Sequence, residues 1–490
     1  MKEVETNPLE GLNEEREQAA AEGTTPVRFV TGCAGSGKTF SIKQKNLEDP
    51  TFARLCATTG IAGVNLGTST INSELGYFDT ESLRDGYSSG WVQKRLRRIA
   101  EQVAWFGIDE ISMMPRQQLD ILHMALTEVN ESRAESDKLP LGLILTGDFA
   151  QLPPIPGPLY KDGKQVINPK TKFPVKEPTP WAFNAECWSE FDSHTIKLTK
   201  IWRQDNPQFL SALNAIRRGA GTAGVSLLTP LIEWLPRLDR AFDGTTIMAK
   251  NEEVDRYNNL RLMELTGDKF SVTSTRWWAT AVQGRKQPGE WNNIPERLDL
   301  KVGALVMLLD NKKDPEFPEE FLYCNGDLAH IEELIYAPQF DLDEYGEPLA
   351  LPSIKGELTG IGVKLIRSGR EVVINRITRA IEQKHEPEEP EIRSFPKVRQ
   401  GSSRTGKKVW ILGEVNFFPI RLAYATTVHK SQGLSLDSVM VDPSSHFFGN
   451  AQMAYVALSR CRTPEGLKVV GKPAGLAGKV KVDENIRRFL

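Results

Sequence analysis

Eight consecutive residues, 32 to 39, carry the plainest chemistry in this sequence. They read Gly-Cys-Ala-Gly-Ser-Gly-Lys-Thr and fit the G-x-x-x-x-G-K-[ST] pattern of a phosphate-binding loop. The apolar run 27–30 before them predicts a buried strand, and residues 40–42 after them can open a helix. The segment therefore predicts a nucleoside triphosphate site. A glycine-rich turn with an incidental Lys-Thr is the alternative.

Each residue type in this loop suits one task. Glycines let the backbone curl so that its N–H groups face phosphate oxygens, helped by the N-terminus of the following helix. We expect Lys38 to reach the β- and γ-phosphates and the Thr39 hydroxyl to ligate Mg²⁺. The residues expected to surround the phosphates are Gly32, Cys33, Ala34, Gly35, Ser36, Gly37, Lys38 and Thr39.

Two further apolar runs lead into polar residues. Residues 103–108 predict a strand followed by Asp109 and Glu110, and residues 141–146 predict a strand followed, after a short turn, by Gln151. Strand carboxyl ends meet at the ligand-binding edge of an open α/β sheet. Asp109 is therefore the candidate second anchor for Mg²⁺, and Glu110 can take a proton from the attacking water or orient it. Gln151 is the candidate sensor of the γ-phosphate. The alternative is a Gly/Pro loop whose polar groups satisfy the backbone.

Composition places the chain among ordinary globular proteins. A chain of 490 residues is too long to fold around a single hydrophobic core, so we expect two to four domains. The formal charge is −3. No apolar run approaches a membrane span, and the first residues lack a secretory segment. The five cysteines are scattered without a C-x-x-C pair, so we expect neither a zinc site nor a disulfide framework, and a reducing, cytoplasmic location.

The pattern of strands, turns and helices divides the chain into segments. Repeated strand, turn and helix signals predict α/β domains with parallel sheets, and short alternating runs predict an inserted β-barrel. The expected segments are a loosely ordered polar N-terminus (1–26), a first α/β domain (27–160), a Pro- and Lys-rich connector (161–180), a second α/β domain in two parts (181–297 and 416–490), and the β-barrel between those parts (298–415).

Seven segments, in this order, resemble the motifs of superfamily 1 helicases, in particular the 5′-to-3′ branch that contains the PIF-type and RecD-like helicases. They are the phosphate loop 32–39, then 58–65, 108–112, 147–154, 202–204, 427–433 and 455–460. The resemblance extends from about residue 26 to about residue 471. It implies two RecA-like P-loop domains, a small wedge insertion at about 74–100 in the first, and an SH3-like β-barrel insertion in the second.

The resemblance also implies that ATP lies between the two RecA-like domains. Arg203 and Arg460 then reach the γ-phosphate from the second domain, where guanidinium groups stabilise developing charge. For Arg203, a surface ion pair with Asp205 is the alternative. Gly433 belongs to the nucleotide side. The family's adenine-reading glutamine is displaced here, and Gln18 is the residue assigned to adenine.

Single-stranded DNA is the partner that the resemblance implies. Hydroxyls, amides and helix-start N–H groups can contact phosphates and sugars without reading base sequence. In the wedge, aromatic residues can stack at the junction with duplex or form the wedge's own core; these are Tyr77, Phe78, Tyr87 and Trp91. The expected DNA contacts are Thr58, Thr59, Gly60, Asn65, Asn72, Thr427, His429, Lys430 and Ser431.

These features together predict an ATP-dependent DNA helicase whose ATP hydrolysis is stimulated by DNA. We expect it to translocate 5′ to 3′ on single strands, to unwind duplex as a monomer, and to act in DNA replication, recombination and repair. The expected setting is a bacterial or viral host cytoplasm, away from membranes. Two alternatives stay open: a DNA clamp that ATP switches without unwinding, and a P-loop kinase that ignores DNA.

Overall fold

The computed structural model describes residues 2–4, 7–59, 62–63, 66, 68–77, 79–161, 164–169, 174–178, 180–278, 294–310, 312–316, 321–323, 327–342, 348–366, 368–383, 399–402, 408–449 and 452–490. These residues form two compact units. The first comprises Met1–Val254 and Thr426–Leu490, and the second Asp255–Ala425.

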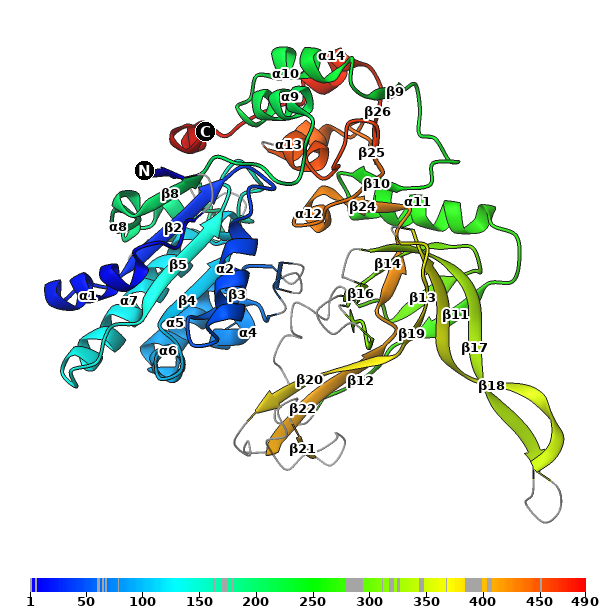
Figure 1. Cartoon of the computed structure of the whole chain (residues 1–490), viewed down its shortest axis with the longest axis horizontal. Coiled ribbons are helices and arrows are strands. Elements are labelled where there is room, and N and C mark those ends of the chain that lie inside the picture. Colours follow the sequence, from blue (N-terminus) through cyan, green and yellow to red (C-terminus); the bar gives the residue numbers. More distant parts are fainter. Residues whose placement is uncertain are drawn as a thin grey trace. The chain divides into compact units, whose positions relative to one another are not determined.

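A six-stranded parallel sheet lies at the centre of one half of the first unit (Figure 1). Because every neighbouring pair is parallel, all carboxyl ends lie at one edge, where the loops that follow the strands can meet. The strands predicted at 103–108 and 141–146 are both present, each within two residues of its expected bounds. In spatial order the strands are β1 (Lys2–Val4), β8 (Thr195–Leu198), β2 (Val27–Gly32), β5 (Gly142–Gly147), β4 (Trp105–Asp109) and β3 (Ala53–Ala57).

The N-terminal segment is ordered, contrary to the expectation of a loose tail. Strand β1 pairs with β8, and helix α1 (Leu12–Glu22) packs Leu12 into the core beside β2. The sequence signal is weak because β1 has only three residues and its partner is almost 200 residues away in the chain.

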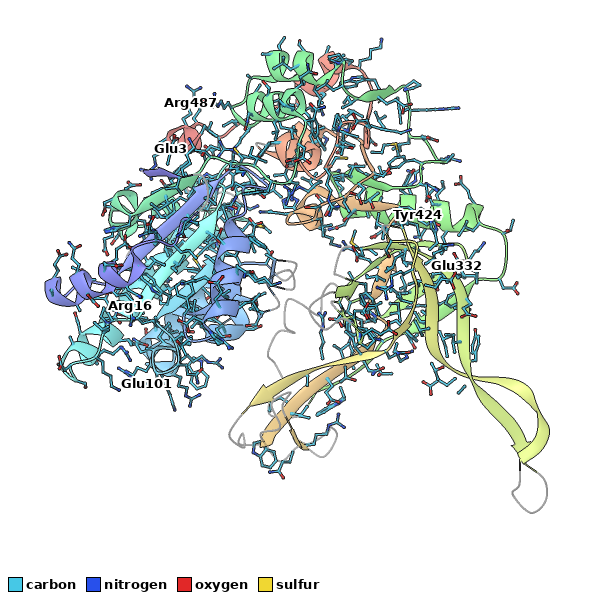
Figure 2. The ribbon with its side chains drawn as sticks, in the orientation of Figure 1. Glu3, Arg16, Glu101, Glu332, Tyr424 and Arg487 are labelled. Atoms are coloured by element: carbon cyan, nitrogen blue, oxygen red, sulfur yellow. The ribbon has the colours of Figure 1, made fainter. Side chains whose placement is uncertain are left out.

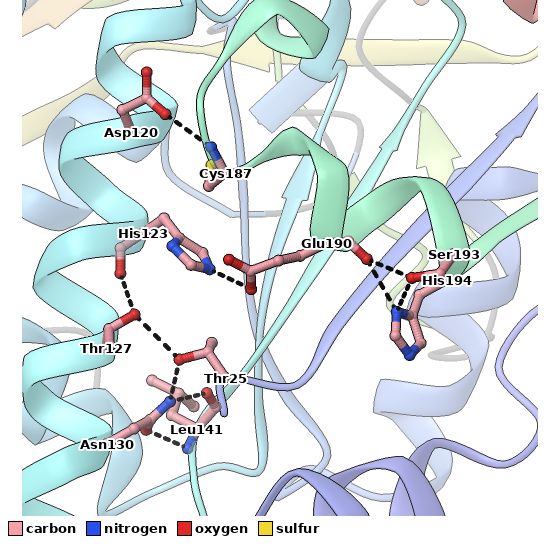
Figure 3. A network of polar contacts seen from close by, with 10 residues as sticks. All are labelled: Thr25, Asp120, His123, Thr127, Asn130, Leu141, Cys187, Glu190, Ser193 and His194. Carbon is pink, nitrogen blue, oxygen red and sulfur yellow. Dashed lines mark hydrogen bonds and ion pairs between the residues drawn. The ribbon is translucent and has the colours of Figure 1, made fainter. Parts of the chain in front are cut away.

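The second α/β domain also begins later than the predicted residue 181. The segment after Trp181 contains η2 (Ala182–Asn184), α8 (Trp188–Ser193) and β8, and β8 is a strand of the first sheet. Helix α8 is joined to α7 (Arg116–Ala134) by the Cys187 N–H, which donates to Asp120, and by the His123–Glu190 contact at 3.1 Å (Figure 3). The expected boundary at 181 was therefore wrong, because a single buried strand cannot be assigned to either sheet from sequence alone.

The remaining helices of this half surround the sheet. The expected wedge region contains two helices, α5 and α6, which pack against α7. Tyr77 is buried and donates to Gln118, and Tyr87 donates to Glu128, so both serve the local packing. Phe78 lies outside the described residues. The helices are α2 (Lys38–Glu48), α4 (Ile71–Leu75), α5 (Thr80–Ser88) and α6 (Trp91–Ala100).

An aromatic cluster anchors the turn that follows β5. Phe149 is fully buried, and its ring contacts five other aromatic rings at centroid distances of 4.7 to 5.9 Å, in edge-on or tilted arrangements. Such pairs add about 0.5–1.5 kcal/mol each beyond area burial. These contacts hold Phe149 in place and so fix the turn from Asp148 to Gln151. The five rings are those of Phe29, Trp181, Phe183, Trp188 and Phe489.

A second sheet of five strands forms the other half of the first unit, and β10, β25, β26 and β9 in it run parallel. In spatial order its strands are β24 (Ala425–Thr427), β10 (Thr245–Met248), β25 (Val439–Val441), β26 (Leu467–Val470) and β9 (Glu233–Leu235). Its helices are α9 (Pro207–Arg217), α10 (Gly221–Leu228), α12 (Val428–Ser431), α13 (Met453–Leu458) and α14 (Pro473–Ala477).

The second unit is mainly antiparallel β-structure and is larger than the predicted insertion 298–415. It starts within α11 (Asn251–Glu264), and strands outside the predicted range pair with strands inside it. The predicted bounds were therefore wrong at both ends. The outlying strands are β11 (Phe270–Thr273), β12 (Thr275–Trp278) and β23 (Ile420–Leu422), and β13 (Arg297–Leu300) begins one residue before the predicted range.

The strands of this unit form two larger sheets, one in the order β19-β18-β17-β14-β23 and one in the order β12-β22-β20, with β21 paired to β22. Their bounds are β14 (Leu305–Leu308), β17 (Leu328–Leu342), β18 (Pro348–Leu365), β19 (Glu371–Asn375), β20 (Ile377–Gln383), β21 (Arg399–Ser402) and β22 (Lys408–Phe417).

Candidate active site

The loop 32–39 connects the end of β2 to the start of α2, as the sequence predicts. Gly35 and Gly37 have φ of 82° and 89°, in the left-handed region that favours glycine. A Cβ at Gly35 would lie 2.4 Å from the Cβ of Arg203, and the Trp202 N–H donates to the Gly35 carbonyl at 2.8 Å. The loop is thus packed directly against the segment 202–204.

Lys38 begins α2 and is buried. Its Nζ donates to the carbonyls of Gly32 (2.8 Å) and Cys33 (3.0 Å). Burial lowers the pKa of Lys38, and the carboxylates of Asp148 and Glu110 oppose this shift. The ammonium is therefore held inside the curve of the loop, where the phosphates of a nucleotide are expected.

The Asp109 carboxylate lies at the end of β4 and is oriented by three donors. The Thr39 hydroxyl donates to one oxygen at 2.7 Å, and the Thr146 hydroxyl and the Glu110 N–H donate to the other at 2.5 and 2.9 Å. The structure thus brings together Thr39 and Asp109, the two residues predicted to hold a metal ion. Thr146 is an additional partner that no sequence motif indicated.

Glu110 adopts a left-handed conformation, with φ of 56°. The Thr58 hydroxyl donates to its carbonyl at 2.7 Å, and Gln432 Nε2 donates to its carboxylate at 3.2 Å. Burial, followed by the neighbouring Asp109 carboxylate, raises the pKa of Glu110 to about 7. A carboxylate with a raised pKa near neutrality is suited to general base catalysis.

Two buried glutamines face this region with unsatisfied oxygens. Gln151 follows the Asp148 turn, and its N–H donates to the Asp148 carbonyl at 2.8 Å. The side-chain oxygens of Gln151 and Gln432 have no hydrogen-bond partner among the described residues. Because buried polar atoms without partners are rare, these two oxygens mark places where a ligand or water can donate.

The two candidate finger arginines lie close to one another. Arg203 Nη1 donates to the Ser459 carbonyl at 3.4 Å, and burial, then the charge of Arg460, lowers its pKa to about 9. Arg460 is fully buried and donates to the carbonyls of Val456 and Leu434. No ion pair joins Arg203 to Asp205 among the described residues, so the surface-pair alternative finds no support there.

Besides Thr146, sequence reasoning missed two residues of this region. Tyr455 and Arg217 both contact Asp148, at 3.3 and 2.7 Å. Tyr455 stands within the segment 455–460, so its place in a motif was a usable signal. Arg217 belongs to none of the seven segments and carried no signal beyond its position at the end of a helix.

The structure does not bring Gln18 to the phosphate loop. Gln18 is exposed on α1 and donates to Glu22 of the same helix. Its neighbours Glu15 and Arg16 contact Arg28 and the Pro140 carbonyl, at the amino ends of β2 and β5 (Figure 2). The loop lies at the opposite, carboxyl end of β2. The assignment of Gln18 to adenine was therefore wrong.

The predicted DNA contacts fall into three groups. His429 is exposed, and Lys430, Asn72, Thr58 and Thr59 are partly exposed. Thr427 is buried and caps α12, where its hydroxyl accepts from the Lys430 N–H at 3.3 Å. The buried Ser431 hydroxyl donates to the Val428 carbonyl at 2.8 Å, so this conformation presents neither side chain to a DNA strand. Gly60 and Asn65 lie outside the described residues, and Gly433 adopts φ of 80° directly after Gln432.

Within the described ranges, no helix is long and apolar enough to cross a bilayer.

Comparison with known proteins confirms the resemblance. A family profile described as PIF1-like helicase matches residues 13–220. The chain is 31% identical over 448 residues to the ATP-dependent DNA helicase Pif1 of Bdellovibrio bacteriovorus, covering 90% of this chain and 84% of that protein. It is 25% identical over 493 residues to the ATP-dependent DNA helicase Pif1 of Campylobacter jejuni, covering 94% and 93%.

Solved structures agree. A Bacteroides Pif1 helicase double mutant matches with a TM-score of 0.62 and 26% identity, covering 97% of this chain and 95% of that one. Bacteroides sp. Pif1 in complex with ADP-AlF4 matches with a TM-score of 0.62 and 25% identity, covering 98% and 96%. With its phosphate loop, paired carboxylates and finger arginines arranged as described, the chain belongs to the Pif1 family of ATP-dependent DNA helicases.

Proposed function

We propose that this helicase translocates 5′ to 3′ on single-stranded DNA and unwinds duplex ahead of it. ATP hydrolysis between its two parallel-sheet halves, which we assign as RecA-like domains, drives each step. One observation carries the proposal: Gln432, directly after the segment 427–431 to which we assign DNA contacts, donates to the carboxylate of Glu110 at 3.2 Å. A change in how that segment holds DNA can thereby reach the group that activates water.

The residues present fit a nucleotide with a divalent cation. The glycine loop curves around Lys38, and unsatisfied glutamine oxygens face the same region. Thr39 and Asp109 would hold Mg²⁺, which supplies charge neutralisation on the β- and γ-phosphates. Exposed aromatic rings border the loop: Trp202 is 57% exposed beside Gly37, and Phe40 is exposed in the first turn of α2. We assign the nucleotide base to this border in place of Gln18.

The chain's own residues then divide the chemistry. Glu110 accepts the proton of the attacking water, and Gln151 orients that water. Lys38, Arg203 and Arg460 stabilise the charge that develops on the transferred phosphoryl group. Because both arginines contact the segment at Ser459, the second sheet must be in place for the site to be complete.

Helix α6 supports a role at the junction of single strand and duplex. Trp91, Lys94, Arg95 and Arg98 follow one another at i, i+3, i+4 and i+7, so they share one face, while Val92, Leu96 and Ile99 are buried on the other. Arg95 reaches the carbonyl of Glu74 in α4, the helix that carries Asn72. No ion pair involves Lys94 or Arg98 in the described part of the chain. We assign contacts with DNA phosphates to this face. We assign the β-rich second unit as the SH3-like domain that guides a DNA strand.

Relatives support DNA as the substrate. A structure of Bacteroides Pif1 bound to ssDNA matches this chain with a TM-score of 0.54 and 25% identity. A clamp that ATP switches without unwinding has little need of a carboxylate positioned for repeated ATP hydrolysis, so the half-buried, hydrogen-bonded Glu110 argues against this alternative.

Paired tailed duplexes test the proposal. With ATP and Mg²⁺, the protein should unwind a duplex with a 5′ tail and leave a 3′-tailed duplex of the same sequence intact. Lys38→Ala should bind single strands yet unwind neither. Unwinding of the 3′-tailed substrate alone would overturn the polarity, and DNA-stimulated ATP turnover without unwinding of either would favour the clamp.

A further inference from the structure

The hydroxyl of Tyr455 bridges two parts of the nucleotide site from a helix of the second sheet. Tyr455 lies on α13 and is 4% exposed. Its oxygen accepts from the backbone N–H of Ala34, in the phosphate loop, at 3.0 Å. The same hydroxyl lies 3.3 Å from Asp148 Oδ2, to which it donates.

Asp148 is fully buried and paired with Arg217 at 2.7 Å. Burial alone would raise the pKa of Asp148, but the charge and hydrogen bonds of Arg217 outweigh it, and the pKa is lowered. Burial, then Asp148, raises the pKa of Tyr455 well above its usual value. Asp148 is therefore ionised and the phenol protonated, which fixes the direction of each hydrogen bond: Ala34 N–H to Tyr455, and Tyr455 O–H to Asp148.

This chain of bonds connects the parts of the site that must move together. Ala34 belongs to the loop that carries Lys38, and Asp148 forms the turn that carries Gln151. Arg217 ends α9, whose Asn214 accepts from Cys33 of the loop at 3.4 Å. Arg460 follows Tyr455 by five residues and donates to the carbonyl of Val456, Tyr455's neighbour. Packing alone needs no hydroxyl at Tyr455, because a phenyl ring would fill the same space.

We propose that Tyr455 is a positioning residue for ATP hydrolysis. Its hydroxyl contacts Asp148, which Arg217 holds in place, and thereby positions the finger arginines relative to the phosphate loop. The inference rests on the nucleotide site proposed above. Because the fingers act on charge that develops during phosphoryl transfer, loss of the hydroxyl weakens binding of the transition state more than binding of the product nucleotide.

Tyr455→Phe tests this on the full-length protein. With saturating single-stranded DNA, kcat should fall about tenfold, the effect of losing one or two hydrogen bonds in a buried site, while KM for ATP changes less than about threefold. The Kd of ADP with aluminium fluoride, a transition-state analogue, should rise about tenfold relative to the Kd of ADP alone. A ratio of two Kd values does not depend on the fraction of protein folded.

Tyr424→Phe is the matched control. Tyr424 is 3% exposed in the second unit, and its hydroxyl also accepts a backbone N–H, that of Leu305 at 3.1 Å (Figure 2). Both variants should lose similar stability, but only Tyr455→Phe should change the ratio of Kd values. An unchanged ratio in Tyr455→Phe, with ATP turnover lost in Lys38→Ala, would overturn the positioning role alone. Turnover persisting in Lys38→Ala would overturn the nucleotide site itself.

Discussion

At the residue scale, the site depends on how few conformations its carboxylates can adopt. Asp109 receives hydrogen bonds from two hydroxyls and one N–H, and Glu110 is held at positive φ between Thr58 and Gln432. A non-glycine residue at positive φ costs of order 1–3 kcal/mol and persists where the surroundings require it. The result is a half-buried carboxylate whose direction is set by the fold.

Glu110→Gln isolates the role of that carboxylate as a base. The amide oxygen can still accept from Gln432, so the local packing is retained while the proton acceptor is lost. We expect kcat for ATP hydrolysis to fall by about 10²–10⁴, the usual contribution of general base catalysis. ADP should bind with nearly unchanged Kd in a fluorescence titration. A kcat within a factor of a few of the wild type would mean that another group activates the water.

Much of the candidate site could be predicted from the sequence, because each of the predicted residues follows a strand in a recognisable pattern. The phosphate loop, Asp109, Glu110 and Gln151 all lie at the carboxyl edge of one sheet. Tyr455, Arg217 and Thr146 were not assigned, because their roles depend on side-chain contacts between distant segments. Gln18 was wrong because it bonds Glu22 of its own helix, and its neighbours Glu15 and Arg16 bind at the amino ends of β2 and β5, away from the loop.

At the scale of elements, short strands and helices decide what belongs together. Strands β1 and β8 have three and four residues, yet they extend the first sheet and carry the chain to Trp202 beside the phosphate loop. Strand β12 likewise pairs with β22, which lies far along the sequence. Local periodicity identifies such strands poorly, because their stability comes from the pairing and not from the segment itself.

Helix α6 gives a test of the junction assignment. Arg98 lies on the face with Trp91 and Lys94, whereas the adjacent Arg97 lies on another exposed face. Arg98→Ala should weaken binding to a forked duplex and reduce the slope of log affinity against log salt by about one, as expected for one lost phosphate contact. Filter binding across salt concentrations measures this. Arg97→Ala is the control and should keep the wild-type slope; equal slopes for both variants would refute the assignment.

At the scale of the whole molecule, the nucleotide site is assembled from two parallel sheets in one compact unit. The first supplies the loop and the carboxylates. The second supplies Arg460, Tyr455 and Gln432 through α12, α13 and the residues that follow them. The general α/β plan was predictable from repeated strand and helix signals, but the partition of the chain was not, because β8 pairs with β2 and β12 pairs with β22, each far away in the sequence.

The central claim is that DNA contact and ATP hydrolysis are coupled through Gln432 and Glu110. The most direct test is the ratio of ATP turnover with saturating single-stranded DNA to turnover without DNA, in the wild type and in Gln432→Ala. We predict a large ratio in the wild type and a ratio near one in the variant, with single-strand affinity changed little. An equally large ratio in Gln432→Ala would contradict the account.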